Sequence, residues 1–260
     1  MTGATFVKRR PGAPAGMFAA EAAGLRWLGS AGAVAVAAPL EVSEDALVLP
    51  RIAQVAPSRA SARAFGTSLA ALHAAGAAHV GAPPTGWDAD GFVGPLPLPH
   101  VHDPSAPEAE DWGTFYARLR LRPYLRRARD LGSIDADGEA VLGAVCARLE
   151  DGDRRLTGPV EPPARLHGDL WAGNVLWSAE GAVLIDPAAH GGHRETDLAM
   201  LALFGLPHLD AVLAAYTDAA PLTPGWRQRV AVHQLHPLLV HAVLFGRSYG
   251  AQAVAVARGL

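Results

Sequence analysis

The feature that most constrains this chain is the segment RLHGDLWAGN at residues 165–174. Two apolar, β-prone runs follow it, VLW and AVLI, and the turn-forming residues SAEG at 178–181 separate them. This pattern predicts a short antiparallel hairpin, with Asn174 entering its first strand and Asp186 leaving its second. Because antiparallel pairing brings the outer ends of a hairpin together, we expect these two side chains to meet.

The spacing of the polar residues points to a chemistry. Asp169 and Asn174 are five residues apart, which is the spacing of a kinase catalytic loop. With Asp186 they would place carboxylate and amide oxygens at one spot, as a hard cation requires. An Asp beside a Gly is most often only a turn residue. The full combination of His-Gly-Asp, the later Asn and a strand ending in Ile-Asp is much rarer by chance, so the segment indicates phosphoryl transfer.

Length and composition limit the other possibilities. The 260 residues are 50% hydrophobic and 18% charged, which suffices for one large domain or for two lobes. The net charge is -3 and no long basic run occurs, so neither nucleic acid nor a membrane surface is expected as a partner. Cys146 is the only cysteine, which excludes an internal disulfide and favours a reducing cytoplasm. No apolar run reaches membrane-spanning length.

The start of the chain contains a second charged pair. A short β-prone run ends in Lys8, and a helix predicted over residues 17–28 carries Glu21. A strand lysine followed by a helix glutamate is the ion pair that positions ATP phosphates in kinases. Alone, two such charges are usually solvated surface groups. The pair gains weight from its place ahead of the catalytic segment.

The rest of the chain reads as two strands and a series of helices, with a lobe boundary after residue 52. We expect the strands at 34–40 and 46–49 around one turn, and an ordered Gly- and Pro-rich loop across the cleft at 81–107. The predicted helices are 58–78, 111–130 with a break at Pro123, 137–149, 197–204, 209–218 and 226–258. The predicted class is α+β, with an N-terminal lobe at 1–52 and a helical lobe at 53–260.

Several segments together resemble the fructosamine kinase (ketosamine-3-kinase) family, a branch of the aminoglycoside-phosphotransferase-like kinases. The resemblance runs nearly end to end, and LWAGN with IDPA and GHRE is its most specific part. It implies a two-lobed protein-kinase-like fold with ATP and Mg²⁺ in the cleft. The segments that carry it are 6–8, 18–25, 86–87, 92–94, 112–123, 167–174, 185–188, 192–205 and 234–246.

The resemblance also implies roles for individual residues. Asp169 would be the catalytic base, and Asn174 and Asp186 would be the magnesium ligands. Lys8 would contact the phosphates, and Glu21 would hold Lys8. The other implied roles are hinge contacts to adenine by Pro50 and Ile52, support of the catalytic loop by His167 and Asp197, and an acceptor site at Trp171, His193, Arg194 and Glu195.

Two of these implied sites carry an alternative or a restriction. Pro50 has no backbone N–H, so it could offer only its carbonyl oxygen to adenine. Trp171 could equally be an ordinary core residue, because large aromatic side chains are usually mostly buried.

The implied activity is phosphorylation of a sugar hydroxyl of ketosamines on proteins or free amines, which repairs glycation. A small-molecule kinase of the aminoglycoside or choline type is the first alternative. Its cationic substrates usually need an acidic patch, and none is evident near the C-terminal helices. A pseudokinase-like binding protein is the second. The retained Lys8, Asp169, Asn174 and Asp186 count against it.

The sequence departs from the family at its start. Only seven residues precede Lys8, whereas the family has a strand, a glycine-rich loop and a second strand ahead of this lysine. Such loops present backbone N–H groups to phosphate oxygens. We therefore expect this chain to hold ATP poorly, either because its start was assigned too late or because the loop was lost with the activity. The intact downstream residues favour a late start.

Overall fold

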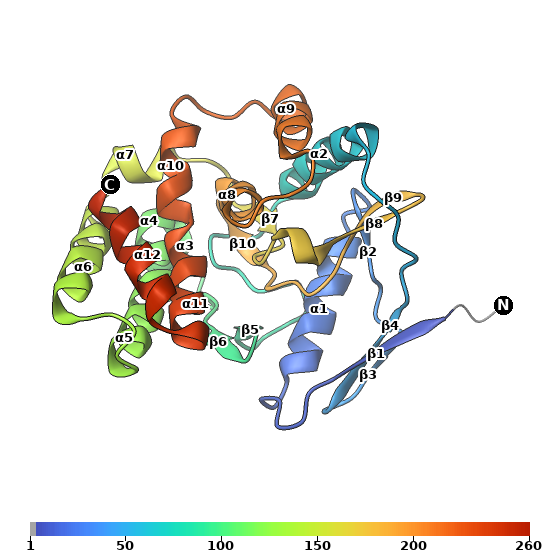
Figure 1. Cartoon of the computed structure of the whole chain (residues 1–260), viewed down its shortest axis with the longest axis horizontal. Helices are drawn as coiled ribbons and strands as arrows, with labels where there is room; N and C mark the ends of the chain where they lie inside the picture. Colours follow the sequence, from blue (N-terminus) through green and yellow to red (C-terminus); the bar gives the residue numbers. More distant parts are fainter. Residues whose placement is uncertain (1–3) are drawn as a thin grey trace.

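The computed structural model describes residues 4–260 and has a small sheet at one end and a larger helical body. The sheet has the order β1–β4–β3 and is antiparallel throughout, with Lys8 opposite Leu47. Helix α1 (Met17–Gly29) packs on it through a small apolar cluster that includes Phe18, Leu25 and Leu47. Figure 1 shows these elements in blue, apart from the green and red helices. The strands are β1 (Thr5–Arg9), β3 (Glu41–Val42) and β4 (Ala46–Pro50).

The prediction of one strand over residues 34–40 is wrong. Only β2 (Ala35–Val36) forms there, and it pairs in parallel with β9 (Gly181–Leu184), far away in the sequence. The chain then passes Pro39, which cannot donate a ladder hydrogen bond, and β3 joins β4 instead. This stretch therefore connects the N-terminal sheet to a second sheet of order β2–β9–β8.

The predicted catalytic hairpin is present in the second sheet. Strand β8 (Val175–Ser178) pairs antiparallel with β9, from Val175 opposite Leu184 to Ser178 opposite Gly181. The short ladder of β7 (Ala164–Leu166) with β10 (His190–Gly192) lies beside it and leads into the His-Gly-Asp loop. In Figure 1 the hairpin is drawn in yellow at the right, below α2 and above the blue sheet.

Helix α2 (Arg59–Ala74) begins where the sequence predicts, at a capping box formed by Ser58 and Ser61. It packs closely along α9 (Leu209–Ala219), and a Cβ added at Gly66 would lie 2.2 Å from the backbone oxygen of Val212. Only glycine permits this close approach of the two helices. Their shared core also covers the β8–β9 hairpin.

Most of the remaining helices form the largest core of the described chain, whereas Leu198 and Leu201 belong to the core that α2 and α9 share. The predicted helix 111–130 contains a π-helical turn just before Pro123, where the missing N–H and the ring of proline disturb regular α-helical bonding. The single helix expected over 226–258 is instead α10, α11 and α12, which are separated at Gln234 and at Gly246, whose φ is 92°. The helices of this body are α3 (Pro107–Glu110), α4 (Trp112–Phe115), the π-helix η1 (Tyr116–Leu121), α5 (Arg122–Asp130), α6 (Ala136–Glu150), α7 (Arg154–Thr157), α8 (Glu195–Leu203), α10 (Trp226–His233), α11 (Leu235–Phe245) and α12 (Arg247–Arg258).

The Gly- and Pro-rich segment at 81–107 is ordered and contains a small hairpin of β5 (Gly91–Val93) and β6 (Leu96–Leu98). Phe92 packs against the apolar cluster beneath α1. This segment therefore links the helical body to the N-terminal sheet, across the cleft between them. Within residues 4–260, no helix is both long and apolar enough to cross a membrane.

Candidate active site

The loop that follows β7 brings Asp169 and Asn174 into direct contact. The Asn174 side-chain amide donates to the backbone oxygen of Asp169 at 2.8 Å and to its carboxylate at 3.1 Å. Its Nδ2 also lies 3.4 Å from the backbone oxygen of Asp186. These bonds use the amide nitrogen, so the side-chain oxygen of Asn174 is left for another partner, such as a cation. The expected meeting of the two hairpin ends is confirmed.

The backbone conformation and close packing at the second position of the His-Gly-Asp motif require a glycine. Gly168 has a φ of 81°, and a Cβ added there would lie 2.0 Å from the backbone oxygen of Ala188. On its N-terminal side, His167 Nε2 donates to the backbone oxygen of Ile185 at 2.8 Å, and its Nδ1 accepts from the Asp169 amide at 3.3 Å. Burial lowers the pKa of His167, so the imidazole stays neutral. The histidine thus ties the loop to the end of the β9 strand.

Asp197 lies directly beneath the same loop. Its buried carboxylate accepts hydrogen bonds from the backbone amides of His167 and Gly168, at 2.8 and 3.0 Å, and contacts His73 Nε2 at 3.1 Å. Burial raises the pKa of Asp197, but the bonds and charges from His73 and His167 outweigh it, and the net pKa is lowered. An ionised carboxylate therefore holds the backbone of the His-Gly-Asp loop.

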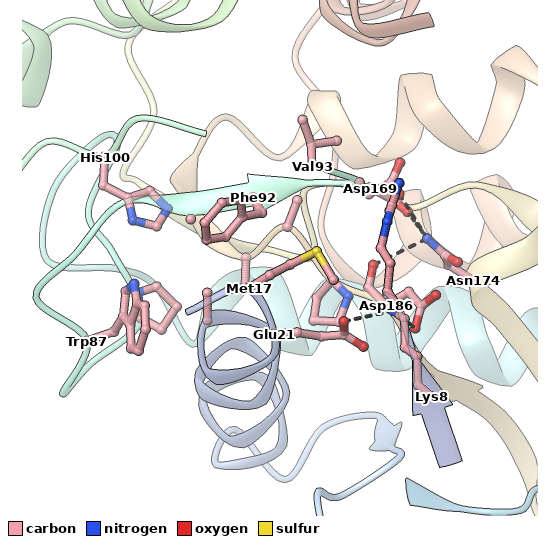
Figure 2. Close-up of a pocket in the computed structure, with 18 of the residues that line it drawn as sticks. Lys8, Met17, Glu21, Trp87, Phe92, Val93, His100, Asp169, Asn174 and Asp186 are labelled. Carbon is pink, nitrogen blue, oxygen red and sulfur yellow. Dashed lines mark hydrogen bonds and ion pairs between the residues drawn. The ribbon is translucent and has the colours of Figure 1, made fainter. Parts of the chain in front are cut away.

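The N-terminal sheet supplies a cation to this site. Lys8 Nζ lies 2.7 Å from Glu21 Oε2 and 3.0 Å from Asp186 Oδ1, so one ammonium joins β1, α1 and the end of the hairpin (Figure 2). Asp186 adopts a left-handed φ of 52°, which is uncommon for a residue with a Cβ, and such backbone positions cluster at functional sites. The predicted Lys8–Glu21 pair is present, and Asp186 extends it.

Neighbouring charges and burial shift the pKa values of Lys8 and Glu21. Burial lowers the pKa of Lys8, yet the carboxylates of Glu21 and Asp186 outweigh it and the net pKa is raised. Burial also raises the pKa of Glu21 to about 7, and Asp186 adds to this against the attraction of Lys8. The raised pKa of Lys8 implies a charged ammonium, whereas the raised pKa of Glu21 implies a partly protonated carboxyl group. We take Lys8 as charged, because two carboxylate oxygens lie within 3.0 Å of its nitrogen.

The carboxyl group of Asp169 has an unusual proton affinity. Burial raises its pKa to about 6, and the charges of Asp186 and Asp197 add to the shift against the hydrogen bond from Asn174. A carboxylate with such a pKa is still mostly ionised at neutral pH, and it is a better proton acceptor than an ordinary aspartate. The environment thus suits a general base.

Two cavities meet at Lys8 and Asp186. One of about 410 Å³ lies on the sheet side, and one of about 550 Å³ lies against α1 and the β5–β6 hairpin, where Figure 2 shows its lining. Of these two cavities, Asp169 and Asn174 line the larger one. The smaller cavity is lined, among others, by Phe6, Leu49, Pro50, Ile52, Leu176 and Ile185.

Trp171 is not a core residue. It is 40% exposed, lines the larger cavity and meets Phe204 edge-on, with ring centroids 6.2 Å apart. A Cβ added at Gly173 would lie 2.2 Å from the indole ring, so this glycine lets the ring fold back over the loop. The ring therefore lies at the larger cavity together with Asp169, and its contact with an acceptor stays a prediction.

The expected acceptor turn at residues 193–195 lies outside this cavity. His193 and Glu195 are buried, and Glu195 forms an ion pair with Arg229 at 2.6 Å. Arg194 binds Glu161 at 2.6 Å. These side chains join α8 to α10 and to the segment before β7, because the turn points into the helical body. They are structural contacts in this fold, and the expectation of an acceptor role is corrected.

Sequence reasoning missed several side chains that do line the larger cavity: Met17, Trp87, Phe92 and His100. Three of them come from the 81–107 segment, which the sequence predicted as an ordered loop across the cleft without assigning a site role to any of its residues. His100 Nδ1 donates to the backbone oxygen of Ala89, at 3.1 Å. Its pKa is lowered to about 4, by burial first and then by the charge of Arg120. The cavity therefore contains a neutral imidazole.

The fold and the site define a phosphotransferase of the protein-kinase-like class. A choline/ethanolamine kinase family protein from Mesorhizobium loti has a similar fold, with a TM-score of 0.58 at 18% identity, covering 98% of this chain and 81% of that one. A candidate fructosamine-3-kinase from Thermobifida fusca is much more similar, with a TM-score of 0.87 at 48% identity, covering 98% and 84%.

The sequence comparisons agree with the structural ones. The profile of the fructosamine kinase family, described as "Fructosamine kinase", matches residues 2–260. A probable ketoamine kinase from Enterococcus faecium is 34% identical over 255 residues, which cover 96% of this chain and 84% of that protein. The chain belongs to the fructosamine kinase family and is a phosphotransferase.

Proposed function

We propose that this chain transfers the γ-phosphoryl group of ATP to a sugar hydroxyl of a ketosamine, a fructosamine or ribulosamine carried by a protein or a free amine. The observation that carries the proposal is the convergence of Lys8, Asp169, Asn174 and Asp186 at the border of two cavities. Loss of the phosphorylated sugar from its amine would then reverse glycation. Membership of the family supports the ketosamine as acceptor.

The smaller cavity suits the nucleotide. Its lining is mostly apolar, with Lys8 and Asp186 where it meets the larger cavity, and it includes Pro50 and Ile52. Pro50 can offer only its carbonyl oxygen, and the Arg51 amide is already bonded to the Ala4 oxygen at 2.9 Å. The Ile52 amide makes no hydrogen bond among the described residues, so it is the donor that adenine would meet. We accordingly place the lobe boundary after residue 52.

The donor set at the cavity border fits magnesium. A half-exposed Asp186 carboxylate and the unused Asn174 amide oxygen are hard oxygen ligands, and Mg²⁺ usually needs only one or two protein ligands beside phosphate oxygens. When bound, the ion would neutralise charge on the transferred phosphate. Lys8 already pairs with Asp186, so it lies where phosphate oxygens would compete for its ammonium.

Asp169 would orient the acceptor hydroxyl and receive its proton. The Asn174 amide holds the Asp169 carboxylate at 3.1 Å and so fixes its direction toward the larger cavity. A positioned base of this kind contributes about 10²–10⁴-fold to the rate. The exposed indole of Trp171 offers an apolar face to the sugar ring.

Neither rival function is favoured by a particular feature of the site. The larger cavity includes Arg9 and Arg10 on its rim, and its carboxylates are those of the catalytic set, which does not suit polycationic aminoglycosides. A binding protein without catalysis would not need Asp169, Asn174 and Lys8 in mutual reach.

A phosphorylation assay on a panel of acceptors tests the proposal. Purified protein is incubated with labelled ATP and magnesium, together with ribulosamines, fructosamines, an aminoglycoside or choline. We expect magnesium-dependent label transfer to a ketosamine and none to the other two. Transfer to the aminoglycoside or choline alone would replace the proposal with the first rival. Magnesium-independent binding of ATP without transfer to any acceptor would support the second.

A further inference from the structure

An exposed row of aromatic side chains runs from the cleft over α11 and α12. Trp171 is followed by Phe204, His241, Phe245 and Tyr249, and we call this row the aromatic strip. Neighbouring ring centroids are 6.2 Å apart for the first pair, 5.1 Å for the second and 5.3 Å for the third. Tyr249 contacts both His241 and Phe245, at 4.9 and 6.0 Å. Five rings thus form a continuous surface.

Three of the five aromatic side chains of the strip are exposed to solvent, although aromatic side chains are usually mostly buried. Phe245 is 65% exposed, Trp171 40% and Phe204 39%, while His241 and Tyr249 are half-buried between them. Single exposed apolar residues need no explanation, but a contiguous exposed patch marks an interaction surface. Aromatic side chains are also the type most enriched in such surfaces.

The strip continues the acceptor side of the cleft. Trp171 lines the larger cavity together with Asp169 and Asn174. His241 lines a small hollow of about 20 Å³ that also includes Asp169. A molecule whose sugar lies at Asp169 therefore leaves the cleft directly over these rings. From Trp171 to Phe245 the strip reaches up to about 17 Å, the length of roughly five extended residues.

The strip carries no ionised side chain. Burial lowers the pKa of His241, and its Nδ1 donates to the backbone oxygen of Pro237 at 2.7 Å. A free amino acid bearing the ketosamine would place its α-ammonium and α-carboxylate against uncharged rings, which offer neither group an ionic partner. Removing these two charged groups from water without such a partner is costly. A polypeptide has neutral amides at the same positions and can add apolar side chains.

We propose that the aromatic strip binds the polypeptide that carries the ketosamine, with apolar residues next to the modified lysine. The inference rests on the proposed function, because the sugar must occupy the cleft for its carrier to cross the strip. It assigns Phe204, Phe245 and Tyr249 to the selection of protein-bound over free ketosamines. A second copy of this chain is the rival occupant.

The test compares binding of two unlabelled acceptors in the absence of ATP, so that turnover is not required. The probes are free ketosamine-modified lysine and a short peptide with the same modified lysine between leucine and phenylalanine. Binding is measured by calorimetry for the wild type, Phe245→Ser and Phe204→Ser. Leu131→Ser is the matched control, since Leu131 is 64% exposed but does not belong to the strip.

The wild type should bind the peptide more tightly than the free modified lysine. Each strip variant should lose peptide affinity by about five- to thirtyfold, the usual effect of one interface aromatic. The affinity of each strip variant for free modified lysine should stay unchanged, and Leu131→Ser should bind both probes as the wild type does. Equal affinity of the wild type for both probes would overturn the inference and leave the proposed function intact. Failure to bind either probe would overturn both.

Sedimentation of the same variants measures their oligomeric state and so tests whether a second copy of this chain covers the strip. If the wild type dimerises and Phe245→Ser is a monomer with unchanged peptide affinity, the strip is a self-association surface and the inference is wrong. A monomeric wild type whose peptide affinity falls in both strip variants supports it.

Discussion

The two sides of the cleft hold their charged groups in different ways. On the helical side, Asp197 accepts two backbone amides, and the Asp169 carboxylate is held by the Asn174 amide. On the sheet side, Lys8 lies on an edge strand and is positioned by ion pairs alone, with Glu21 and Asp186. Backbone hydrogen bonds fix a group in one geometry, whereas ion pairs of long side chains can exchange partners.

This difference assigns a separate task to each side. In the proposed mechanism a base must stand at one distance and angle from the acceptor hydroxyl, and the hydrogen bonds to Asp197 and Asp169 on the helical side suit that requirement. A cation that meets incoming phosphates has to leave its resting partner, so Lys8 benefits from exchangeable contacts. The account predicts that changes at Asp169 and Asp197 affect turnover and folding, and that changes at Lys8 and at the proposed metal ligands Asp186 and Asn174 affect nucleotide binding.

The largest effect should come from Asp169→Asn. The change keeps the shape and the hydrogen bond with Asn174 but removes the base, so turnover should fall by about 10²–10⁴-fold. ATP affinity should stay close to that of the wild type. Steady-state kinetics with a ketosamine that the wild type phosphorylates provides the measurement, and wild-type-like turnover in the variant would remove Asp169 from the mechanism.

Asp197→Ala should cost the most stability. It leaves His73, His167 N–H and Gly168 N–H without their acceptor, and breaking a buried charged network typically costs about 3–5 kcal/mol. Because the folded pKa of Asp197 is lowered, its contribution is present above the unfolded pKa and is lost as the pH falls through the folded pKa.

Urea unfolding at neutral and acidic pH checks this sign. The difference between wild type and Asp197→Ala should shrink on acidification. Glu161→Ala, which removes a partly exposed ion pair with Arg194, is the comparison and should cost less. If Asp197→Ala lowers the free energy of unfolding by no more than Glu161→Ala does, Asp197 does not hold the His-Gly-Asp loop.

The raised pKa of Asp169 predicts a smaller effect of opposite sign. Its folded pKa of about 6 exceeds the value of about 3.9 for an unfolded aspartate, so the ionised group destabilises the fold above pH 6 and has no effect below about pH 4. Asp169→Asn should therefore be more stable than the wild type at pH 8, by on the order of 1–3 kcal/mol. The gain should vanish near pH 4, and turnover of the wild type should decline below pH 6. Thermal unfolding across this range that shows a destabilised variant would contradict the burial argument.

Trp171→Ala should give the smallest of these effects. The indole is partly exposed and packs on one side only, so its loss should raise the Michaelis constant for the ketosamine by about tenfold and leave that for ATP nearly unchanged. Global unfolding of the variant would show instead that the ring supports the loop.

Local patterns predicted the part of the site that is built from contiguous sequence. The hairpin, its turn and the meeting of Asn174 with Asp186 follow from alternating apolar runs and a spacing of a few residues. The Lys8–Glu21 pair was also found, because one strand and the next helix supply it. These features depend on short-range geometry, which sequence patterns encode.

Contacts between distant segments account for the errors. The turn at 193–195 looked functional, but Arg229 and Glu161, from other parts of the chain, bury it. The parallel pairing of β2 with β9 joins residues far apart, and no local pattern reveals it. His100 was missed for a related reason: its place in the cavity depends on how a long Gly- and Pro-rich segment folds back, which its composition does not determine.

Magnesium-dependent ATP binding tests most directly the central proposal that Asp186 and Asn174 hold the metal while Asp169 acts as the base. Titrating magnesium at fixed nucleotide concentration compares Asp186→Ala, Asn174→Ala and Asp169→Asn with the wild type. The account predicts the greatest loss for Asp186→Ala, because a carboxylate binds a hard cation more strongly than an amide does, a smaller loss for Asn174→Ala, and wild-type binding for Asp169→Asn. Equal and small effects at Asp186 and Asn174, or a loss at Asp169 as large as that at Asp186, would contradict it.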